Sequence, residues 1–233
     1  MKERKVVSVQ SLDKIDFIYK KLYKEYGPQG WWPLINYKGI NPTKTGSVNG
    51  YHPGKYGFPR NEKEKFEICL GAILTQNTNW PNVEKALINL NKEKLLGPKK
   101  ILKSEEVIIK KCIKPAGYYN QKYKKIIIFC DFFISLRGRT PKRKELLNLW
   151  GIGEETADSI LLYAYRKPVW IMDAYTKRVF ERVGINIEQK KKMKYEKINE
   201  IHALIVEHCK RICLKKKPKC EDCKIKEICL FYF

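Results

Sequence analysis

The cysteines of this chain are concentrated near one end. Of eight cysteines in 233 residues, five lie between positions 209 and 229. Clustered cysteines in a reducing compartment are typical of metal ligands rather than disulfides. The spacing C-x6-C-x2-C-x5-C predicts four ligands, Cys213, Cys220, Cys223 and Cys229. Four thiolates hold a zinc ion or a [4Fe–4S] cluster, so spacing alone leaves both metals open, with free buried thiols as a lesser alternative.

The remaining cysteines are expected in the core. Cys209 precedes Cys213 by one helical turn, which suits a packed side chain better than a fifth ligand. The other three are scattered through apolar segments: Cys69, Cys112 and Cys130.

Basic residues are abundant, and some lie inside the cysteine loop. The chain carries a formal net charge of +23, which favours a polyanion partner, most often nucleic acid. A Lys-rich thermophile composition would explain the charge differently, but the acidic residues lag behind the basic ones. A short positive loop held by a metal suits contact with DNA phosphates, although most lysine runs are simply solvated. The loop lysines are Lys215, Lys216, Lys217 and Lys219.

A second candidate site lies in residues 140–184. Thr140-Pro141 predicts a helix start, with Pro at the first helical position, and a new helix opens at Glu154. Between these helices, Gly151 and Gly153 form a tight Gly-x-Gly turn whose glycines permit positive φ and let a phosphate approach the backbone. The free N–H groups at the start of the second helix also favour a phosphate.

Asp173 is the candidate catalytic residue. It ends the apolar run Val169-Trp170-Ile171-Met172 and precedes a helix expected over 174–183. Its simplest role is that of a helix N-cap. A carboxylate at a helix start beside a DNA-binding hairpin also suits catalysis, and one side chain can do both.

The remaining pattern predicts an all-α fold. Apolar residues recur at helical spacing over 10–24, from Glu64, and over 80–91, 104–112 and 120–136, while strand patterns are weak. Residues 36–60 are rich in Gly and Pro and are expected to form a long surface loop. No apolar run approaches the roughly 18 residues of a membrane span, and the first ten residues lack a signal-peptide core, so we expect a soluble, intracellular protein.

These motifs together resemble the endonuclease III superfamily of DNA glycosylases. The resemblance covers about residues 62–233. Within the superfamily, the sequence looks most like the bacterial 3-methyladenine DNA glycosylase of the endonuclease III type. The residues that carry this likeness are Trp31-Trp32-Pro33, ILTQNT (73–78), AGYYNQK (116–122), GIGEETADSIL (151–161), Asp173 and the four cysteines.

The resemblance implies an architecture and a cofactor. It implies two helical lobes: a six-helix barrel with the helix-hairpin-helix over 57–167, and a second lobe from 1–56 and 168–233. The cysteine spacing becomes that of a [4Fe–4S] cluster, which demotes zinc. Gln76 and Tyr118 would probe the duplex, and Trp31 and Trp32 would line the base pocket, although a Trp pair more often packs in a core. Tyr51, His52 and Tyr56 are further pocket candidates, whereas His202 and His208 receive no role.

The resemblance also implies a reaction. Bifunctional members have a Schiff-base lysine where this chain has Glu155, so we expect a monofunctional glycosylase that flips and excises an alkylated purine and leaves an abasic site. Asp173 would stabilise the oxocarbenium-like sugar. Alternatives are excision of uracil, mismatched thymine or 8-oxoguanine, or a non-enzymatic iron–sulfur DNA-binding protein. The expected partner is damaged double-stranded DNA, bound by a monomer in the cytoplasm of a prokaryote at its nucleoid, with a composition that also suits a thermophile.

Overall fold

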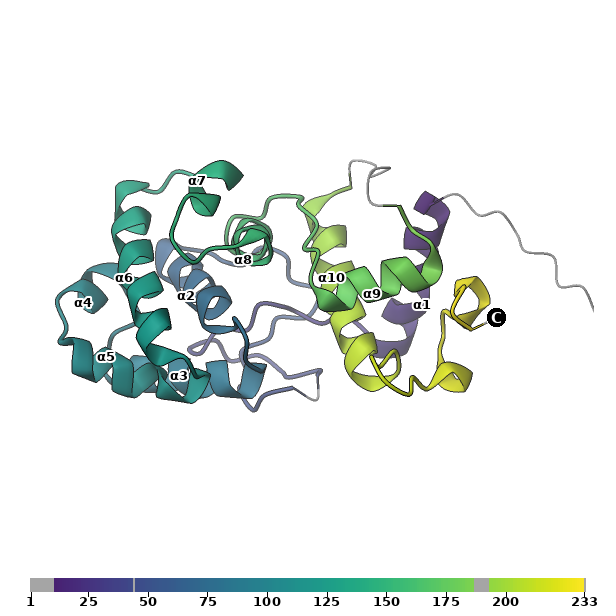
Figure 1. Cartoon of the computed structure of the whole chain (residues 1–233), viewed down its shortest axis with the longest axis horizontal. Coiled ribbons are helices and arrows are strands. Elements are labelled where there is room, and N and C mark those ends of the chain that lie inside the picture. The colour runs from purple at the N-terminus through teal and green to yellow at the C-terminus, as the bar shows by residue number, and fades with distance from the viewer. Residues whose placement is uncertain (1–10, 44, 187–192, 233) are drawn as a thin grey trace, which may run out of the picture.

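The protein is helical throughout the part that the structure describes. The computed structural model describes residues 11–43, 45–186 and 193–232, and these contain helices and turns but no strand. The prediction of an all-α fold is therefore confirmed. Two groups of helices lie at opposite ends of the long axis, and the loop segments between α1 and α2 run between them (Figure 1).

The first group contains the middle of the chain. Its helices pack around a shared apolar core, with α3 on α5, α4 on α6, and α2 on both α3 and α6. The group consists of α2 (Glu62–Leu74), α3 (Trp80–Lys92), α4 (Pro98–Leu102), α5 (Glu106–Ile113), α6 (Tyr119–Ser135), α7 (Arg143–Leu147) and α8 (Glu154–Ser159). A short 3-10 turn, Lys114–Ala116, precedes α6.

The second group joins the two ends of the described chain. Helix α1 (Ser11–Tyr26) packs on α10 (Tyr195–Arg211), which also contacts α9 (Ala174–Val183). The C-terminal segment lies beyond these helices (yellow in Figure 1) and contains two 3-10 turns, Cys220–Asp222 and Lys226–Ile228. The Lys-rich segment around 187–192 lies outside the described residues.

The two helices of the hairpin differ in detail from the sequence prediction. The predicted start at Thr140-Pro141 is wrong, because α7 begins at Arg143. Glu145 explains the later start, since its carboxylate accepts the Lys142 N–H at 2.7 Å and satisfies the first backbone donor there. Helix α8 continues directly into a π-helical turn, Ile160–Ala164, which is buried throughout.

Carboxylates fasten residues 36–60 to the helices. The described part of this segment has no helix and is exposed at many positions, as predicted, but Tyr51 and His52 within it are buried. The backbone N–H groups of Ser47 and Val48 donate to Glu84 of α3 at 2.7 and 2.8 Å. Nearer α2, Tyr56 donates to a Glu200 oxygen of α10 at 2.8 Å. The segment therefore bridges the two helix groups.

No described helix is long and apolar enough to cross a membrane.

Candidate active site and DNA interface

Asp173 lies where the backbone enters α9. Its side chain is buried, and Oδ1 accepts the Thr176 N–H at 2.7 Å, so the predicted N-cap is confirmed. The other oxygen, Oδ2, lies 3.4 Å from Nε2 of His202 on α10. Two neighbours from different helices therefore fix the orientation of one carboxylate.

A tyrosine orients the histidine in turn. The Tyr163 hydroxyl lies 2.6 Å from Nδ1 of His202, and Tyr163 belongs to the π-helical turn after α8. If the hydroxyl donates to Nδ1, the proton of a neutral ring is on Nε2 and faces Asp173. Sequence reasoning gave His202 no role, because only the fold brings α10 beside Asp173.

These contacts determine whether the Asp173 carboxyl group is ionised. Burial acts to raise the pKa of this carboxyl, but the contact with His202 and the hydrogen bond from Thr176 outweigh it and lower the pKa below its ordinary value. The carboxylate is therefore ionised at neutral pH, which suits stabilisation of developing positive charge.

A cavity of about 460 Å³ opens beside Asp173. Its aromatic walls include Trp31 and Trp32, as predicted, and Trp80 of α3, which the sequence analysis missed. The Trp80 ring centroid lies 5.1 Å from that of Trp31 and 5.5 Å from that of Trp32. Trp31 is half-buried and Trp32 is buried. A cavity of this size and character accommodates a flat organic ring.

The three aromatic pocket candidates from residues 36–60 do not line this cavity, so that prediction is wrong. Tyr51 donates to the Thr45 carbonyl at 2.9 Å. His52 contacts the Trp32 carbonyl through Nε2 at 3.0 Å, and Tyr56 contacts Glu200. They hold the segment and Trp32 in place instead.

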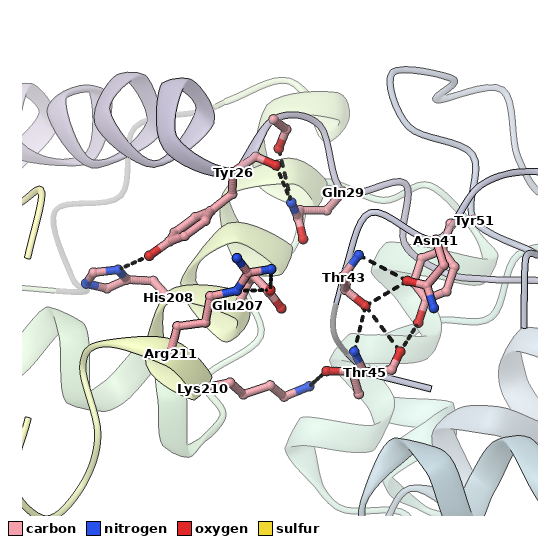
Figure 2. A network of polar contacts seen from close by, with 11 residues as sticks. Tyr26, Gln29, Asn41, Thr43, Thr45, Tyr51, Glu207, His208, Lys210 and Arg211 are labelled. Atoms are coloured by element: carbon pink, nitrogen blue, oxygen red, sulfur yellow. Dashed lines mark hydrogen bonds and ion pairs between the residues drawn. The ribbon is translucent and has the colours of Figure 1, made fainter. Parts of the chain in front are cut away.

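A lysine closes one part of the cavity. Lys210 of α10 donates from Nζ to Thr45 Oγ1 at 3.3 Å, as Figure 2 shows, and Nζ lies 5.9 Å from the Trp31 ring centroid. Burial lowers the pKa of Lys210, although Glu207 and Asp173 act in the opposite direction. The cavity thus combines a carboxylate and a basic nitrogen, and neither Lys210 nor Thr45 was anticipated.

Glu155 lines the same cavity as Asp173. Burial raises its pKa, and the nearby Asp173 carboxylate adds to the effect. A carboxyl group thus occupies the position where the resemblance places a lysine in bifunctional enzymes.

The hairpin is held closed by side chains of its two helices, α7 and α8. Gly151 has φ +80°, a backbone conformation that residues with a Cβ rarely adopt, so glycine is favoured there. Gly153 adopts φ −89°, so the predicted use of positive φ is wrong there, although open space surrounds it. Arg143 of α7 forms two hydrogen bonds with Asp158 of α8, at 2.7 and 3.0 Å.

The two predicted duplex-probing residues differ in their surroundings. Gln76 donates from Nε2 to the Gly151 carbonyl and to Thr156 Oγ1, both at 3.0 Å, so it ties the end of α2 to the hairpin. Tyr118 is 69% exposed and has φ +46° at the start of α6. Tyr118 therefore projects from the surface, whereas Gln76 is held by the protein.

The cysteine loop follows α10. All four loop lysines, Lys215, Lys216, Lys217 and Lys219, are exposed. Arg182 Nη1 lies 3.1 Å from Cys213 Sγ. A hydrogen bond with Cys209, and then the nearby Arg182, lower the pKa of Cys213 below its ordinary value, although burial acts to raise it. Cys209 is buried, as are Cys69, Cys112 and Cys130, so the predicted core thiols are confirmed.

The four predicted ligands lie in the C-terminal segment of the chain. Burial raises the pKa of Cys223, and the thiols of Cys213, Cys229 and Cys220 add to the effect. Within the described residues, no group of three or more His, Cys, Asp or Glu side chains is arranged to hold a single metal ion.

A second histidine of α10 lies beneath this loop. His208 is fully buried, and burial lowers its pKa to about 4. Its Nδ1 lies 2.9 Å from the Tyr26 hydroxyl of α1 (Figure 2), and its Nε2 lies 3.5 Å from Cys223 Sγ.

The sequence matches the family described as HhH-GPD superfamily base excision DNA repair protein over residues 70–203. The chain belongs to this superfamily. A protein of Methanocaldococcus jannaschii named for DNA repair glycosylase activity is 40% identical, over 91% of this chain and 94% of the relative. Endonuclease III of Thermotoga maritima is 32% identical over 75% of this chain and 88% of its own.

A solved structure agrees with these relatives. The 3-methyladenine DNA glycosylase of H. pylori, bound to 1,N6-ethenoadenine, has a TM-score of 0.64 and 26% identity, covering 87% of this chain and 98% of that chain. The predicted endonuclease III superfamily is therefore confirmed, and the helix-hairpin-helix of residues 143–159 is the element after which the HhH-GPD superfamily is named.

Proposed function

We propose that this DNA glycosylase of base excision repair is monofunctional, releasing a damaged base by hydrolysis and leaving an abasic site. The observation that supports this proposal is that Asp173 and Glu155 line the same cavity. Asp173 is ionised and is held in place by contacts with Thr176 and His202. Glu155 cannot form the Schiff base through which a lysine would cleave the strand.

Asp173 would act on the sugar rather than on the base. Its low pKa makes it a weak proton acceptor but a permanent negative charge, which stabilises the oxocarbenium-like sugar as the glycosidic bond breaks. The same carboxylate orients the water that attacks the sugar. His202 and Thr176 keep it in place, so little reorganisation is needed during the reaction.

An alkylated purine is the substrate that the aromatic walls support. Alkylated purines carry positive charge on the ring and are attracted to the faces of tryptophans such as Trp31 and Trp80. They are also good leaving groups. The H. pylori relative is a 3-methyladenine DNA glycosylase, and its structure contains a modified adenine.

Lys210 favours a second candidate substrate. A cation on the cavity wall would repel a cationic base, whereas its N–H groups would donate to the carbonyl oxygens of uracil, mismatched thymine or 8-oxoguanine. Duplexes that each contain one lesion distinguish the two classes in a single-turnover assay. Fast release of 3-methyladenine supports the first, and fast release of uracil or 8-oxoguanine supports the second. DNA binding without release of any base would contradict the enzymatic proposal.

Borohydride trapping tests monofunctionality. The expected result is no covalent protein–DNA adduct, since Glu155 stands at the lysine position. Lys210 also lines the cavity, so Lys210→Met is the matched control. A strong adduct in the parent protein that disappears in Lys210→Met would contradict the proposal and identify the nucleophile.

The cofactor that we propose is a [4Fe–4S] cluster held by Cys213, Cys220, Cys223 and Cys229. The fit rests on the chemistry of the donor set: the thiols of one C-terminal segment act on the ionisation of Cys223, and Cys213 lies beside Arg182. When bound, the cluster ties the C-terminal loop to the helices. Iron and sulfide analysis tests this, and a colourless protein with stoichiometric zinc would contradict it.

DNA would lie against the basic loop and the hairpin. We propose phosphate contacts from Lys215, Lys216, Lys217 and Lys219, which are all exposed, and from the backbone at Gly151 and Gly153. Tyr118 and Gln76 would enter the duplex, which requires Gln76 to leave the Gly151 carbonyl. Binding should weaken steeply with salt, because phosphate contacts release counterions.

A further inference from the structure

His208 is a buried polar side chain that the proposed base excision does not use. The side chain is fully enclosed between α1 and the cysteine loop, away from the cavity beside Asp173. Each ring nitrogen has one polar neighbour. Nδ1 lies 2.9 Å from Tyr26 Oη, and Nε2 lies 3.5 Å from Cys223 Sγ.

The chemistry of the two neighbours determines which ring nitrogen of His208 carries the hydrogen. A cysteine that ligates a metal is a thiolate and can only accept a hydrogen bond. Nε2 must therefore carry a hydrogen that points at Cys223. In a neutral ring, Nδ1 is then an acceptor, and the Tyr26 hydroxyl is the donor that satisfies it. All polar groups of the chain Tyr26–His208–Cys223 are matched in this arrangement and in no other of the neutral ring.

Tyr26 is itself held in place. The guanidinium of Arg211 lies over its ring at 5.2 Å and forms an ion pair with Glu207 (Figure 2). The Tyr26 ring is thus fixed on α1, and its hydroxyl holds the His208 ring in one orientation.

We propose that Tyr26 and His208 are positioning residues for the cluster: they deliver an N–H···S hydrogen bond to Cys223 that raises the reduction potential of the cluster and slows its loss. Hydrogen bonds to ligand sulfurs stabilise the more negatively charged, reduced form, which sets the sign of the effect. The proposal rests on the proposed [4Fe–4S] cluster and not on base excision.

The test compares four variants of the full-length protein with its cluster bound: three single variants and the double variant His208→Gln/Tyr26→Phe. His208→Gln removes the ring donor, Tyr26→Phe removes only the hydroxyl that orients it, and Tyr23→Phe is the matched control one turn earlier on α1. Protein-film voltammetry measures the potential. Loss of visible absorbance under a chelator measures cluster lifetime, and circular dichroism confirms the fold.

We expect His208→Gln to lower the potential by an amount that changes the ratio of reduced to oxidised cluster about fivefold. Tyr26→Phe should shift it in the same direction by less, and the double variant should resemble His208→Gln, because Tyr26 acts only through His208. Tyr23→Phe should leave the potential unchanged.

Other outcomes overturn the proposal. They are an unchanged potential and lifetime in both His208→Gln and Tyr26→Phe, an equal shift in Tyr23→Phe, or a purified protein that contains no iron. Base release from a lesion duplex is measured in parallel on the parent protein. A protein with a normal cluster and no base release would refute the proposed function while leaving this proposal standing.

Discussion

Two tyrosine–histidine pairs have their histidines on the same helix, α10, and use the same atoms to face different groups. In both, a hydroxyl contacts Nδ1, at 2.6 Å in Tyr163–His202 and 2.9 Å in Tyr26–His208. In both, Nε2 faces an acidic group, at 3.4 Å from the Asp173 carboxylate and 3.5 Å from the Cys223 sulfur. The two pairs differ in the group that faces Nε2, which is a carboxylate in one pair and a cysteine sulfur in the other.

The two histidines of α10 therefore lie in different surroundings. The His202 pair faces a cavity, and its acceptor also takes a backbone hydrogen bond from Thr176. The His208 pair is sealed, and its acceptor stands in a loop between two 3-10 turns. One helix thus places one histidine beside the Asp173 carboxylate and another beside the Cys223 sulfur, each with its Nδ1 at a tyrosine hydroxyl.

The largest expected effect comes from removing the Asp173 carboxylate. Asp173→Asn should lower single-turnover base release by about 10³-fold, because an amide cannot stabilise a cationic sugar, while DNA affinity stays near that of the parent. Quenched single-turnover assays measure the first quantity, and fluorescence anisotropy measures the second. Retained full excision would show that Asp173 is only a helix cap.

Removing the histidine beside Asp173 should cost less and leave a pH signature. In His202→Gln we expect about a 10²-fold loss of rate, because the carboxylate loses one of its two partners. His202 lowers the pKa of Asp173, so without it that pKa rises. The acidic limb of the pH–rate profile should therefore move to higher pH. An unmoved limb would show that the 3.4 Å contact does not influence ionisation.

A third change, at Lys210 of α10, affects the cavity but neither tyrosine–histidine pair. Lys210→Met should shift the relative rates for cationic and neutral carbonyl-bearing bases by about tenfold toward the cationic ones, since the variant removes a positive charge from the cavity wall. The lesion panel measures the ratio of rates. Identical ratios in both proteins would show that Lys210 does not contact the flipped base.

The smallest expected effects separate the two pairs. Tyr163→Phe should lower base release about fivefold, the effect of one hydrogen bond, and leave the cluster unchanged. Tyr26→Phe should do the reverse. Rate constants and cluster lifetimes measured on both variants test the separation. If each variant altered both properties equally, the pairs would be parts of one network.

The site residues that could be predicted from the sequence belong to local patterns in the chain. Those that were missed are brought together only by the fold. Asp173 was predictable because an apolar run, a cap residue and an amphipathic helix follow one another in the chain. The clustering of four candidate ligand cysteines was visible from their spacing. Trp80, Tyr163 and Lys210 were missed, because each lies on a helix whose periodicity is fully explained by packing.

The errors have similarly physical origins. Thr140-Pro141 is a good helix start by propensity, but the Glu145 carboxylate caps the backbone two residues later. The burial of part of the Gly- and Pro-rich segment 36–60 was missed because carboxylates that satisfy its backbone, such as Glu84, lie far away in sequence. Buried loops need such distant acceptors, and composition cannot reveal them.

The spacing of His202 and His208 makes α10 intolerant of insertions. Six residues place the two rings about 9 Å apart along the axis and about 120° apart around it. One inserted residue between them would turn the following part of the helix by about 100° and withdraw His208 from Cys223, or His202 from Asp173. Length variation among relatives should therefore fall in the loops on either side of this helix and spare the seven residues from His202 to His208.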